Sequence, residues 1–184
     1  MIEIIKDSLT DDDIRYLFNL WISNKNKIIE NDRNHAQLDI LLLMPFFNSL
    51  NLNYIHPIEN YTQLQLQCQD ESWGKNDYEN SFHTHEGYAD LVYVQYLNDN
   101  YEGGRLIFET GEIYTPKQGD TVIFPGTLGH YVETPTNFTN EYLSIDSDNK
   151  ILLNKRWVVA GFIQSKKLKN QKVMTSLKNP NKLI

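Results

Sequence analysis

The chain has a single cysteine among its 184 residues, Cys68, and this scarcity excludes whole classes of site. One thiol can form neither an intrachain disulfide nor a four-thiolate metal site, so we expect a reducing, cytoplasmic setting. The chain also lacks a run of about 18 apolar residues, which excludes a transmembrane helix. The first residues lack the basic-then-apolar plan of a signal peptide. With 40% apolar residues, the chain is expected to form one globular domain.

Positive charge is scarce in most of the chain and concentrated at its end. Residues 165–184 hold six lysines and no acid, so the net charge of −7 divides into +6 for this segment and −13 for residues 1–164. An acidic body argues against nucleic acid as the main partner. We therefore predict a single domain over residues 1–164, followed by a solvated basic tail over 165–184.

The N-terminal part, about residues 8–50, has helical patterns that follow a short strand over residues 1–6. Thr10 precedes three aspartates, as an N-cap does, and apolar residues follow at helical spacing, which predicts a helix to about residue 30. A second apolar stretch over residues 36–49 is interrupted by Pro45, and predicts a helix that ends or kinks there. Both helices are expected to pack outside the rest of the domain.

The pattern changes to a period of two from about residue 60. Residues 62–68 alternate polar and apolar side chains, as a half-buried strand does. Turn residues then separate further apolar segments, so we expect more strands at 81–85, 90–97, 105–109, 111–115, 120–124, 141–145 and 151–163. Many short strands with regular turns indicate a sandwich or a jelly roll over about residues 60–164, within an α+β domain.

Three of the five histidines have the spacing of metal ligands. His83 and His85 are two residues apart, so on a strand both point to the same side, and His130 follows another expected strand. A lone histidine is usually an ordinary surface or core residue, but a pair with a distant third favours a metal site. Imidazole suits iron, zinc, copper and nickel, so the ligands alone leave the metal open.

A cation, Arg156, opens a β-rich run of residues, 156–162, within the last expected strand. Arginine can bind a carboxylate through two parallel hydrogen bonds, and Arg156 is followed on the same strand face by Val158, Ala160 and Phe162. A cation at the mouth of an apolar wall would suit a dicarboxylic acid. The alternative is a surface arginine at the start of a strand.

These fragments, in their order, resemble the prolyl 4-hydroxylase-like branch of the iron(II)/2-oxoglutarate dioxygenases. The resemblance covers about residues 60–164 and rests on short matching segments: His83-Thr84-His85, Tyr96-Leu97-Asn98, Gly103 to Phe108, Pro116 to Phe124, His130, and Arg156 to Val159. The compact form is similar to oxygenase-like proteins of bacteriophages, which would mean a host cytoplasm. The fold it implies is a double-stranded β-helix, the jelly roll of cupins.

The resemblance also implies a reaction and its residues. His83 and His130 would bind iron, Arg156 would bind the distal carboxylate of 2-oxoglutarate, and Tyr96 would give that carboxylate a second hydrogen bond. The cofactors would be Fe(II), 2-oxoglutarate and O2, with ascorbate as a candidate addition. The expected activity is hydroxylation of a small molecule or of a peptide or protein side chain such as proline, with neither nucleic acid nor membrane as partner.

Two departures from the family pattern bear on activity. The family has Asp or Glu where this chain has His85, so we expect the ligands His83, His85 and His130. Glu86 or Asp90 could supply a carboxylate instead, or His85 could be the first ligand, with Gly87 in the acid's place. The gap between His130 and Arg156 is also long, which predicts an inserted hairpin over residues 133–152.

The missing acid leaves two other functions open. One is a non-catalytic jelly-roll protein with an interaction or structural role. The other is a cupin-like dioxygenase with three histidines and no 2-oxoglutarate. Several aromatic residues are candidates for lining the mouth of a site, although core packing explains each equally well: Trp73, Tyr78, Tyr88, Tyr101, Tyr131 and Trp157.

Overall fold

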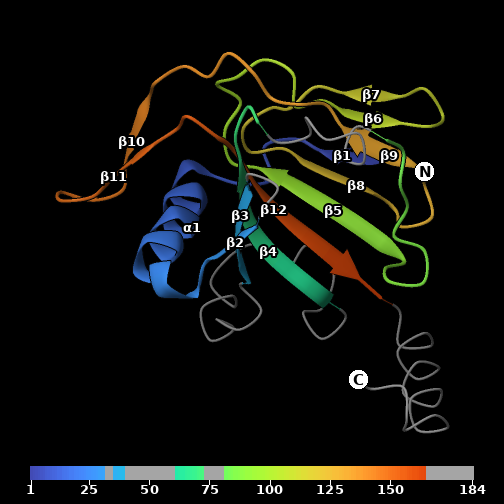
Figure 1. Ribbon diagram of the computed structural model, residues 1–184, viewed down its shortest axis with the longest axis horizontal. Helices are drawn as coiled ribbons and strands as arrows, with labels where there is room; N and C mark the ends of the chain where they lie inside the picture. Colours follow the sequence, from blue (N-terminus) through green and yellow to red (C-terminus); the bar gives the residue numbers. More distant parts are fainter. Residues whose placement is uncertain (32–34, 40–60, 73–80, 165–184) are drawn as a thin grey trace, which may run out of the picture.

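The computed structural model describes residues 1–31, 35–39, 61–72 and 81–164 (Figure 1). The expected basic tail over residues 165–184 and most of the expected second helix lie outside these residues. The strands form a seven-stranded sheet, a three-stranded sheet that faces it, and a separate two-stranded hairpin. All strand pairs are antiparallel. The expected α+β jelly roll is confirmed.

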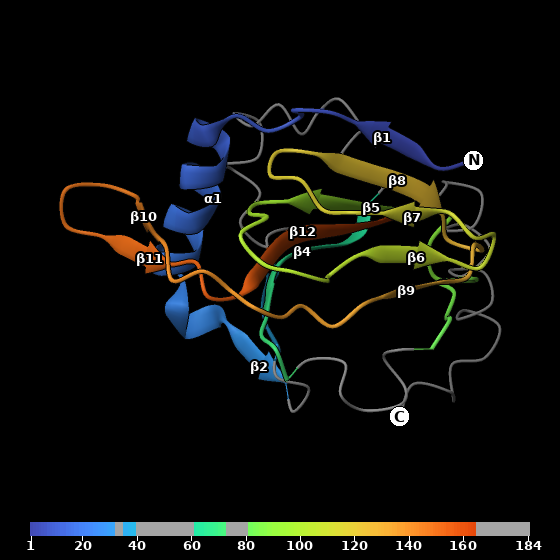
Figure 2. The ribbon, with the colours of Figure 1, turned by 90° about the horizontal axis from the view of Figure 1, so that it is seen from above.

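The strand order explains how distant segments meet. The seven-stranded sheet has, from edge to edge, β1 (Glu3–Ile5), β8 (Thr121–Pro125), β5 (Leu91–Tyr96), β12 (Arg156–Ile163), β4 (Tyr61–Gln69), β3 (His35–Asp39) and β2 (Ile29–Asn31). The smaller sheet has the order β7 (Ile113–Tyr114), β6 (Leu106–Phe108) and β9 (His130–Val132). The hairpin consists of β10 (Tyr142–Ser144) and β11 (Lys150–Leu152), and it projects beside the helix (Figure 2).

The helix α1 (Asp11–Ser23) begins as its sequence predicts. The Thr10 hydroxyl accepts a hydrogen bond from the Asp13 backbone N–H at 3.2 Å, and the Asp13 carboxylate accepts one from the Thr10 N–H at 2.9 Å. The expected end near residue 30 is wrong. Asn24 donates its side-chain amide to the Leu20 carbonyl at 2.9 Å, which caps the last turn, and a 3-10 turn (Lys25–Lys27) leads into β2.

The expected helix over residues 36–49 is wrong where it can be checked. Residues 35–39 form β3, in which Ala36 and Leu38 pair with Cys68 and Leu66 of β4. Burial against these partners overrides the local apolar pattern. The chain therefore has one α-helix in its described part, not two. In that part, no helix is long and apolar enough to span a membrane.

Other strands differ from expectation near the site. Residues 81–85 form a single bridge between His83 and His130 instead of a strand. The expected strand over 151–163 is two strands, β11 and β12, and the hairpin β10–β11 occupies the long gap noted in the sequence.

The seven-stranded sheet has a core on each face. On its outer face, α1 covers a cluster that includes Phe18, Trp21 and Trp157. On its inner face, the cluster between the two sheets includes Val94, Tyr96 and Phe108. Because side chains alternate along a strand, β12 presents Trp157 outward and Val158 inward, and it therefore contributes to both cores.

Candidate active site

The three histidines named from the sequence lie together at one end of the inner face. Their ring nitrogens lie within 4.8 Å of one another, and the ring centroids of His83 and His130 are 4.5 Å apart. The His85 ring lies 5.0 Å from that of His130 and 5.2 Å from that of His83. The arrangement offers three imidazoles to one ion.

The backbone holds these histidines in place from two directions. His83 and His130 are paired residues of an antiparallel bridge, with N–H to carbonyl distances of 3.0 and 3.1 Å, so their side chains share a face. The His85 N–H donates to the Gly126 carbonyl at 2.6 Å. A Cβ at Gly126 would lie 2.0 Å from the Ala89 carbonyl oxygen, so only glycine permits this approach of the two segments.

His130 is the most buried of the three, at 4% exposure. Its Nδ1 lies 2.9 Å from the Leu128 carbonyl oxygen, which fixes Nδ1 as the protonated nitrogen and leaves Nε2 as the ligand atom. Burial, with repulsion from the neighbouring imidazoles, lowers the pKa of His130 to about 4 against the opposing effect of the Leu128 carbonyl. Burial and then the charge of His83 lower the pKa of His85 to about 4. Both rings are therefore neutral at pH 7, the form that binds metals.

The alternative acidic ligands lie elsewhere. Glu86 is exposed on the turn that follows His85, in which Gly87 has a positive φ of 75°. Asp90 is half-buried, where its backbone joins Ile163 and Gly126. In the part of the chain that the structure describes, no carboxylate belongs to the group of ligand atoms. The available donor set is three neutral nitrogens.

Arg156 lies at the other end of the inner face and is 1% exposed. It donates from Nη1 to the Gln69 side-chain carbonyl, and its Cζ lies 5.2 Å from the centre of the Tyr96 ring. Its Nε has no hydrogen-bond partner among the described residues, and none of their carboxylates pairs with it. A buried cation without an anion is costly unless something completes its contacts.

Two phenols beside Arg156 are also incomplete. The hydroxyls of Tyr96 and Tyr101 are buried, and neither makes a hydrogen bond of good geometry within the described residues. Burial raises the pKa of both phenols, and the positive charge of Arg156 opposes that rise. Both phenols are therefore neutral donors. With Nε of the guanidinium, these hydroxyls are donors without an acceptor among the described residues, which is the chemistry that a carboxylate completes.

From the sequence, Tyr101 is only a candidate for lining the mouth of the site. The structure places it beside Arg156, which the sequence did not predict. The signal in the sequence was Gly103-Gly104. A Cβ at Gly104 would lie 2.7 Å from the Tyr101 ring and 3.2 Å from Cδ of Arg156, and the φ of Gly104 is 63°. The glycine thus allows the ring and the guanidinium to meet.

A row of glutamines joins the two ends of the inner face. On β4, Gln63, Gln65, Gln67 and Gln69 pair with Phe162, Ala160, Val158 and Arg156 of β12. Paired residues share a face, so the polar side of β4 lies beside the inner core and not in solvent. At the far end of the row, the Phe162 ring lies 4.9 Å from that of His85. The wall thus runs from the arginine to the histidines.

The candidate mouth aromatics divide between the two faces. Tyr88 lies 5.3 Å from Phe162 and Tyr131 lies 5.0 Å from Phe82, both near the histidines. Trp157 is on the outer face, in contact with Phe18 and Trp21, so it does not line the mouth. Trp73 and Tyr78 lie outside the described residues.

Comparison with known proteins places the fold. No protein-family model and no curated protein sequence matches the chain. Among solved structures, a 2OG-Fe(II) oxygenase family oxidoreductase from Burkholderia pseudomallei aligns over 88% of this chain and 82% of its own, with a TM-score of 0.56 and 11% identity. The fold is that of the 2OG-Fe(II) oxygenases.

Two other structures are similar at lower scores. A Pseudomonas putida prolyl-4-hydroxylase matches 89% of this chain and 92% of its own, with 12% identity and a TM-score of 0.45. A putative oxygenase from Shewanella oneidensis matches 99% and 91%, with 12% identity and a TM-score of 0.47. At 11% identity, the likeness to the Burkholderia structure concerns the fold alone, and the chemistry depends on the residues of this chain.

Proposed function

We propose that the protein is an Fe(II)- and 2-oxoglutarate-dependent dioxygenase that hydroxylates a C–H bond of its substrate. The observation that carries the proposal is the buried Arg156 beside two phenols that lack acceptors, on the same face of the sheet as three converging imidazoles. The arginine end of the inner face suits a carboxylate, and the histidine end suits a metal. 2-Oxoglutarate needs both, because its 2-oxo acid group chelates a metal and its distal carboxylate needs a cation.

Each group has a defined task in this proposal. His83, His85 and His130 would hold the iron, and Leu128 would fix the donor nitrogen of His130. Arg156, Tyr96 and Tyr101 would hold the distal carboxylate, while Phe108 and Phe124 pack beside His130 and limit water there. Iron with 2-oxoglutarate and O2 supplies the oxidising chemistry, and the protein supplies binding and orientation.

The test is a comparison of two 2-oxo acids. The protein is prepared with Fe(II) under nitrogen, and binding is measured by the visible absorption that appears when a 2-oxo acid chelates Fe(II). 2-Oxoglutarate should bind more tightly than pyruvate, which has the same chelating group but no distal carboxylate. Arg156→Met should remove this preference and leave pyruvate binding unchanged. Equal affinities in the wild-type protein would contradict the proposal.

Turnover is then tested with O2, ascorbate and candidate substrates, beginning with proline-containing peptides. Succinate formation that rises when a substrate is added would identify the substrate class. The matched control is His130→Ala, which keeps the anchor but removes a ligand.

The absence of a carboxylate among the ligands favours one alternative, a three-histidine dioxygenase that needs no 2-oxoglutarate. In that case Arg156→Met would keep full activity. A non-catalytic jelly roll would bind neither iron in near-stoichiometric amount nor 2-oxoglutarate. Metal analysis and the Arg156 variant therefore separate the three functions.

Variants of His85 decide whether it is a ligand. His85→Ala should weaken iron binding strongly if three histidines hold the metal, and His85→Asp should bind Fe(II) at least as tightly as the wild-type protein because a carboxylate suits a hard cation. Unchanged iron affinity in His85→Ala would show instead that His85 is a neighbour of the site.

A further inference from the structure

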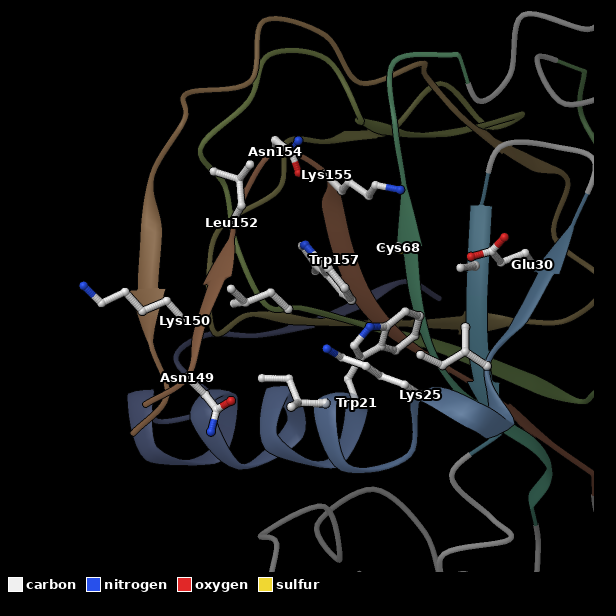
Figure 3. Close-up of a pocket in the computed structure, with 14 residues that line it drawn as sticks. Trp21, Lys25, Glu30, Cys68, Asn149, Lys150, Leu152, Asn154, Lys155 and Trp157 are labelled. Carbon is white, nitrogen blue, oxygen red and sulfur yellow. The ribbon is translucent and has the colours of Figure 1, made fainter. Parts of the chain in front are cut away.

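A second cavity lies on the outer face of the seven-stranded sheet, away from the candidate active site. It has a volume of about 510 Å³ and lies between α1, β11 and the segment that leads into β12 (Figure 3). This volume is in the range of small-molecule sites, roughly 300–1,000 Å³. Trp157 and Cys68 form its wall on the sheet, whereas their chain neighbours Arg156 and Gln69 meet on the inner face. The cavity and the candidate active site therefore lie on opposite faces of the same strands, β4 and β12.

Trp157 brings an unpaired donor to this cavity. The residue is 4% exposed, and its indole Nε1 has no hydrogen-bond partner among the described residues. Leaving a buried N–H without an acceptor is destabilising. In Figure 3 the nitrogen lies on the side of the ring toward the β10–β11 hairpin. An acceptor atom of a bound molecule would satisfy it.

Two aromatic rings give the cavity a rigid apolar wall. The rings of Trp21 and Trp157 are 4.9 Å apart and nearly perpendicular, at 87°, and they are 8% and 4% exposed. Phe18 packs against Trp157 at 5.1 Å and 83°. The parts of the two indoles that line the cavity favour an aromatic ring that contacts them along its edge or face.

The rim of the cavity is positively charged. Lys25, Lys150 and Lys155 come from three different segments, and Glu30 is the acid among the lining residues. No salt bridge involves these three lysines within the described chain. Residues 1–164 carry a net charge of −13, so this concentration of lysine is local. It favours an anion.

The thiol in the wall does not point to covalent chemistry. Burial, outweighing the nearby charge of Lys155, raises the pKa of Cys68 to about 11, so the thiol is neutral at pH 7. A neutral thiol is a poor nucleophile, and Cys68 acts as a small apolar surface.

We propose that this cavity binds a small organic anion with a planar ring. The ring would lie against Trp21 and Trp157, an acceptor atom would take the indole N–H of Trp157, and the anionic group would meet the lysines of the rim. The proposal also gives the inserted hairpin a role, since β11 supplies Lys150 and, with Ile151, one wall. It does not depend on iron or on 2-oxoglutarate.

The probe is 1-naphthyl phosphate, titrated into the full-length protein labelled with 15N at low salt. The three tryptophans give three indole N–H signals, which Trp→Phe variants assign. The Trp157 signal should shift and saturate. 1-Naphthol lacks the charge and inorganic phosphate lacks the ring, so each should bind more weakly than the probe.

Matched lysine variants test the rim. Lys25→Gln combined with Lys150→Gln should weaken binding about fivefold, the effect of two exposed charges. Lys27→Gln combined with Lys117→Gln removes the same charge outside the cavity and should leave the affinity unchanged. All four lysines are exposed, so these variants should fold normally.

Four results would overturn the proposal. One is a Trp157 signal that does not shift at any concentration of the probe. Another is equal affinity for 1-naphthol and the probe, which would mean an apolar site without anion recognition. The third is equal affinity for inorganic phosphate, which would mean an adventitious ion only. An equal loss of affinity in both double variants would likewise show a general charge effect.

Discussion

The two faces of the seven-stranded sheet differ in what their buried polar groups lack. On the outer face, helix α1 seals an apolar core, and the unpaired donor of Trp157 lies at its margin, beside a cavity. On the inner face, Arg156 is buried without an anion, with one hydrogen bond to Gln69 and an unpaired Nε. The hydroxyls of Tyr96 and Tyr101 beside it are buried without an acceptor among the described residues. Packing explains the apolar core of the outer face. The polar groups buried on the inner face cost stability, and the 2-oxo acid proposed above would offset that cost by completing their contacts.

Adjacent residues of β12 show the contrast most clearly. Arg156 and Trp157 are both buried, yet they point to opposite faces, and only Trp157 packs among aromatic rings. If the comparison is right, substitutions in the core of the outer face should change the free energy of unfolding and leave 2-oxoglutarate binding intact. Substitutions on the inner face should do the opposite.

The largest effect is expected from Phe18→Ala on the outer face. Phe18 is fully buried between α1 and Trp157, and removing such a ring typically costs about 3–5 kcal/mol of unfolding free energy. Urea denaturation measures the change, and the folded fraction should bind iron and 2-oxoglutarate normally. Phe82→Ala, at a residue that is 51% exposed, is the control and should be nearly neutral. Loss of 2-oxoglutarate binding in folded Phe18→Ala would contradict the separate roles of the two faces.

Arg156→Met should give the reverse pattern. Losing a buried charged contact to a carboxylate should weaken 2-oxoglutarate binding about 100-fold. The free energy of unfolding without ligand should stay equal or rise, because the substitution removes an uncompensated buried charge and keeps a side chain of similar length. Calorimetry and urea denaturation measure the two quantities. The control, Arg105→Met, removes an arginine that pairs with Glu133 at 2.6 Å and should leave the affinity unchanged. A marked loss of stability in Arg156→Met would show that the arginine is structural.

The sequence predicted the strand over residues 62–68 and the helix start because those features are local. Alternation over residues 62–68 and the Thr10 cap need only their neighbours in the chain. It did not predict which side of that alternation faces inward. The glutamines of β4 look solvent-facing by polarity, and only the pairing with Arg156 and Phe162 shows otherwise. The same holds for β3, whose apolar run depends on β4 for its conformation.

For the candidate site, the sequence predicted most of the residues but not how they come together. The two-residue spacing suggested His83 and His85, and the framework of motifs suggested His130, Tyr96 and Arg156. Their convergence depends on a bridge between residues 47 positions apart, which no local pattern encodes. Tyr101 was missed as a partner of Arg156 for the same reason. Trp157 was one of six candidate aromatics for the mouth, but strand alternation places it on the other face, in the core.

Asp120 sharpens the comparison because it links the inner core to the N-terminal edge of the sheet. Its carboxylate accepts hydrogen bonds from Lys6 Nζ at 2.7 Å, the Asp7 N–H at 3.0 Å and the Tyr114 hydroxyl at 2.9 Å. Tyr114 belongs to the inner core, and Lys6 to the N-terminal edge. Asp120→Asn keeps one acceptor and loses the charge, so it should cost about 1–2 kcal/mol of unfolding free energy.

The pH dependence of this variant has a definite sign. Burial raises the pKa of Asp120, but the hydrogen bonds from Lys6, Asp7 and Tyr114 outweigh it, so the folded pKa lies below the ordinary value of 3.8. A depressed pKa contributes stability that is fully present above the unfolded pKa and is lost as pH falls through the folded one. The difference between wild type and Asp120→Asn should therefore be constant near neutrality and shrink below about pH 4. A difference that grows on acidification would contradict this account.

The smallest effect, and the finest test of the inner face, is expected from Tyr101→Phe. The hydroxyl lies buried beside Arg156 without an acceptor, so its removal should leave the unfolding free energy of the ligand-free protein unchanged or slightly higher. The same change should weaken 2-oxoglutarate binding about fivefold, the value of one neutral hydrogen bond, and leave pyruvate binding as it was. Tyr131→Phe, at a half-buried tyrosine near the histidines, is the control and should change neither acid. If Tyr101→Phe instead destabilises the free protein and spares 2-oxoglutarate, the hydroxyl serves the fold, and the inner face differs from the outer one only at Arg156.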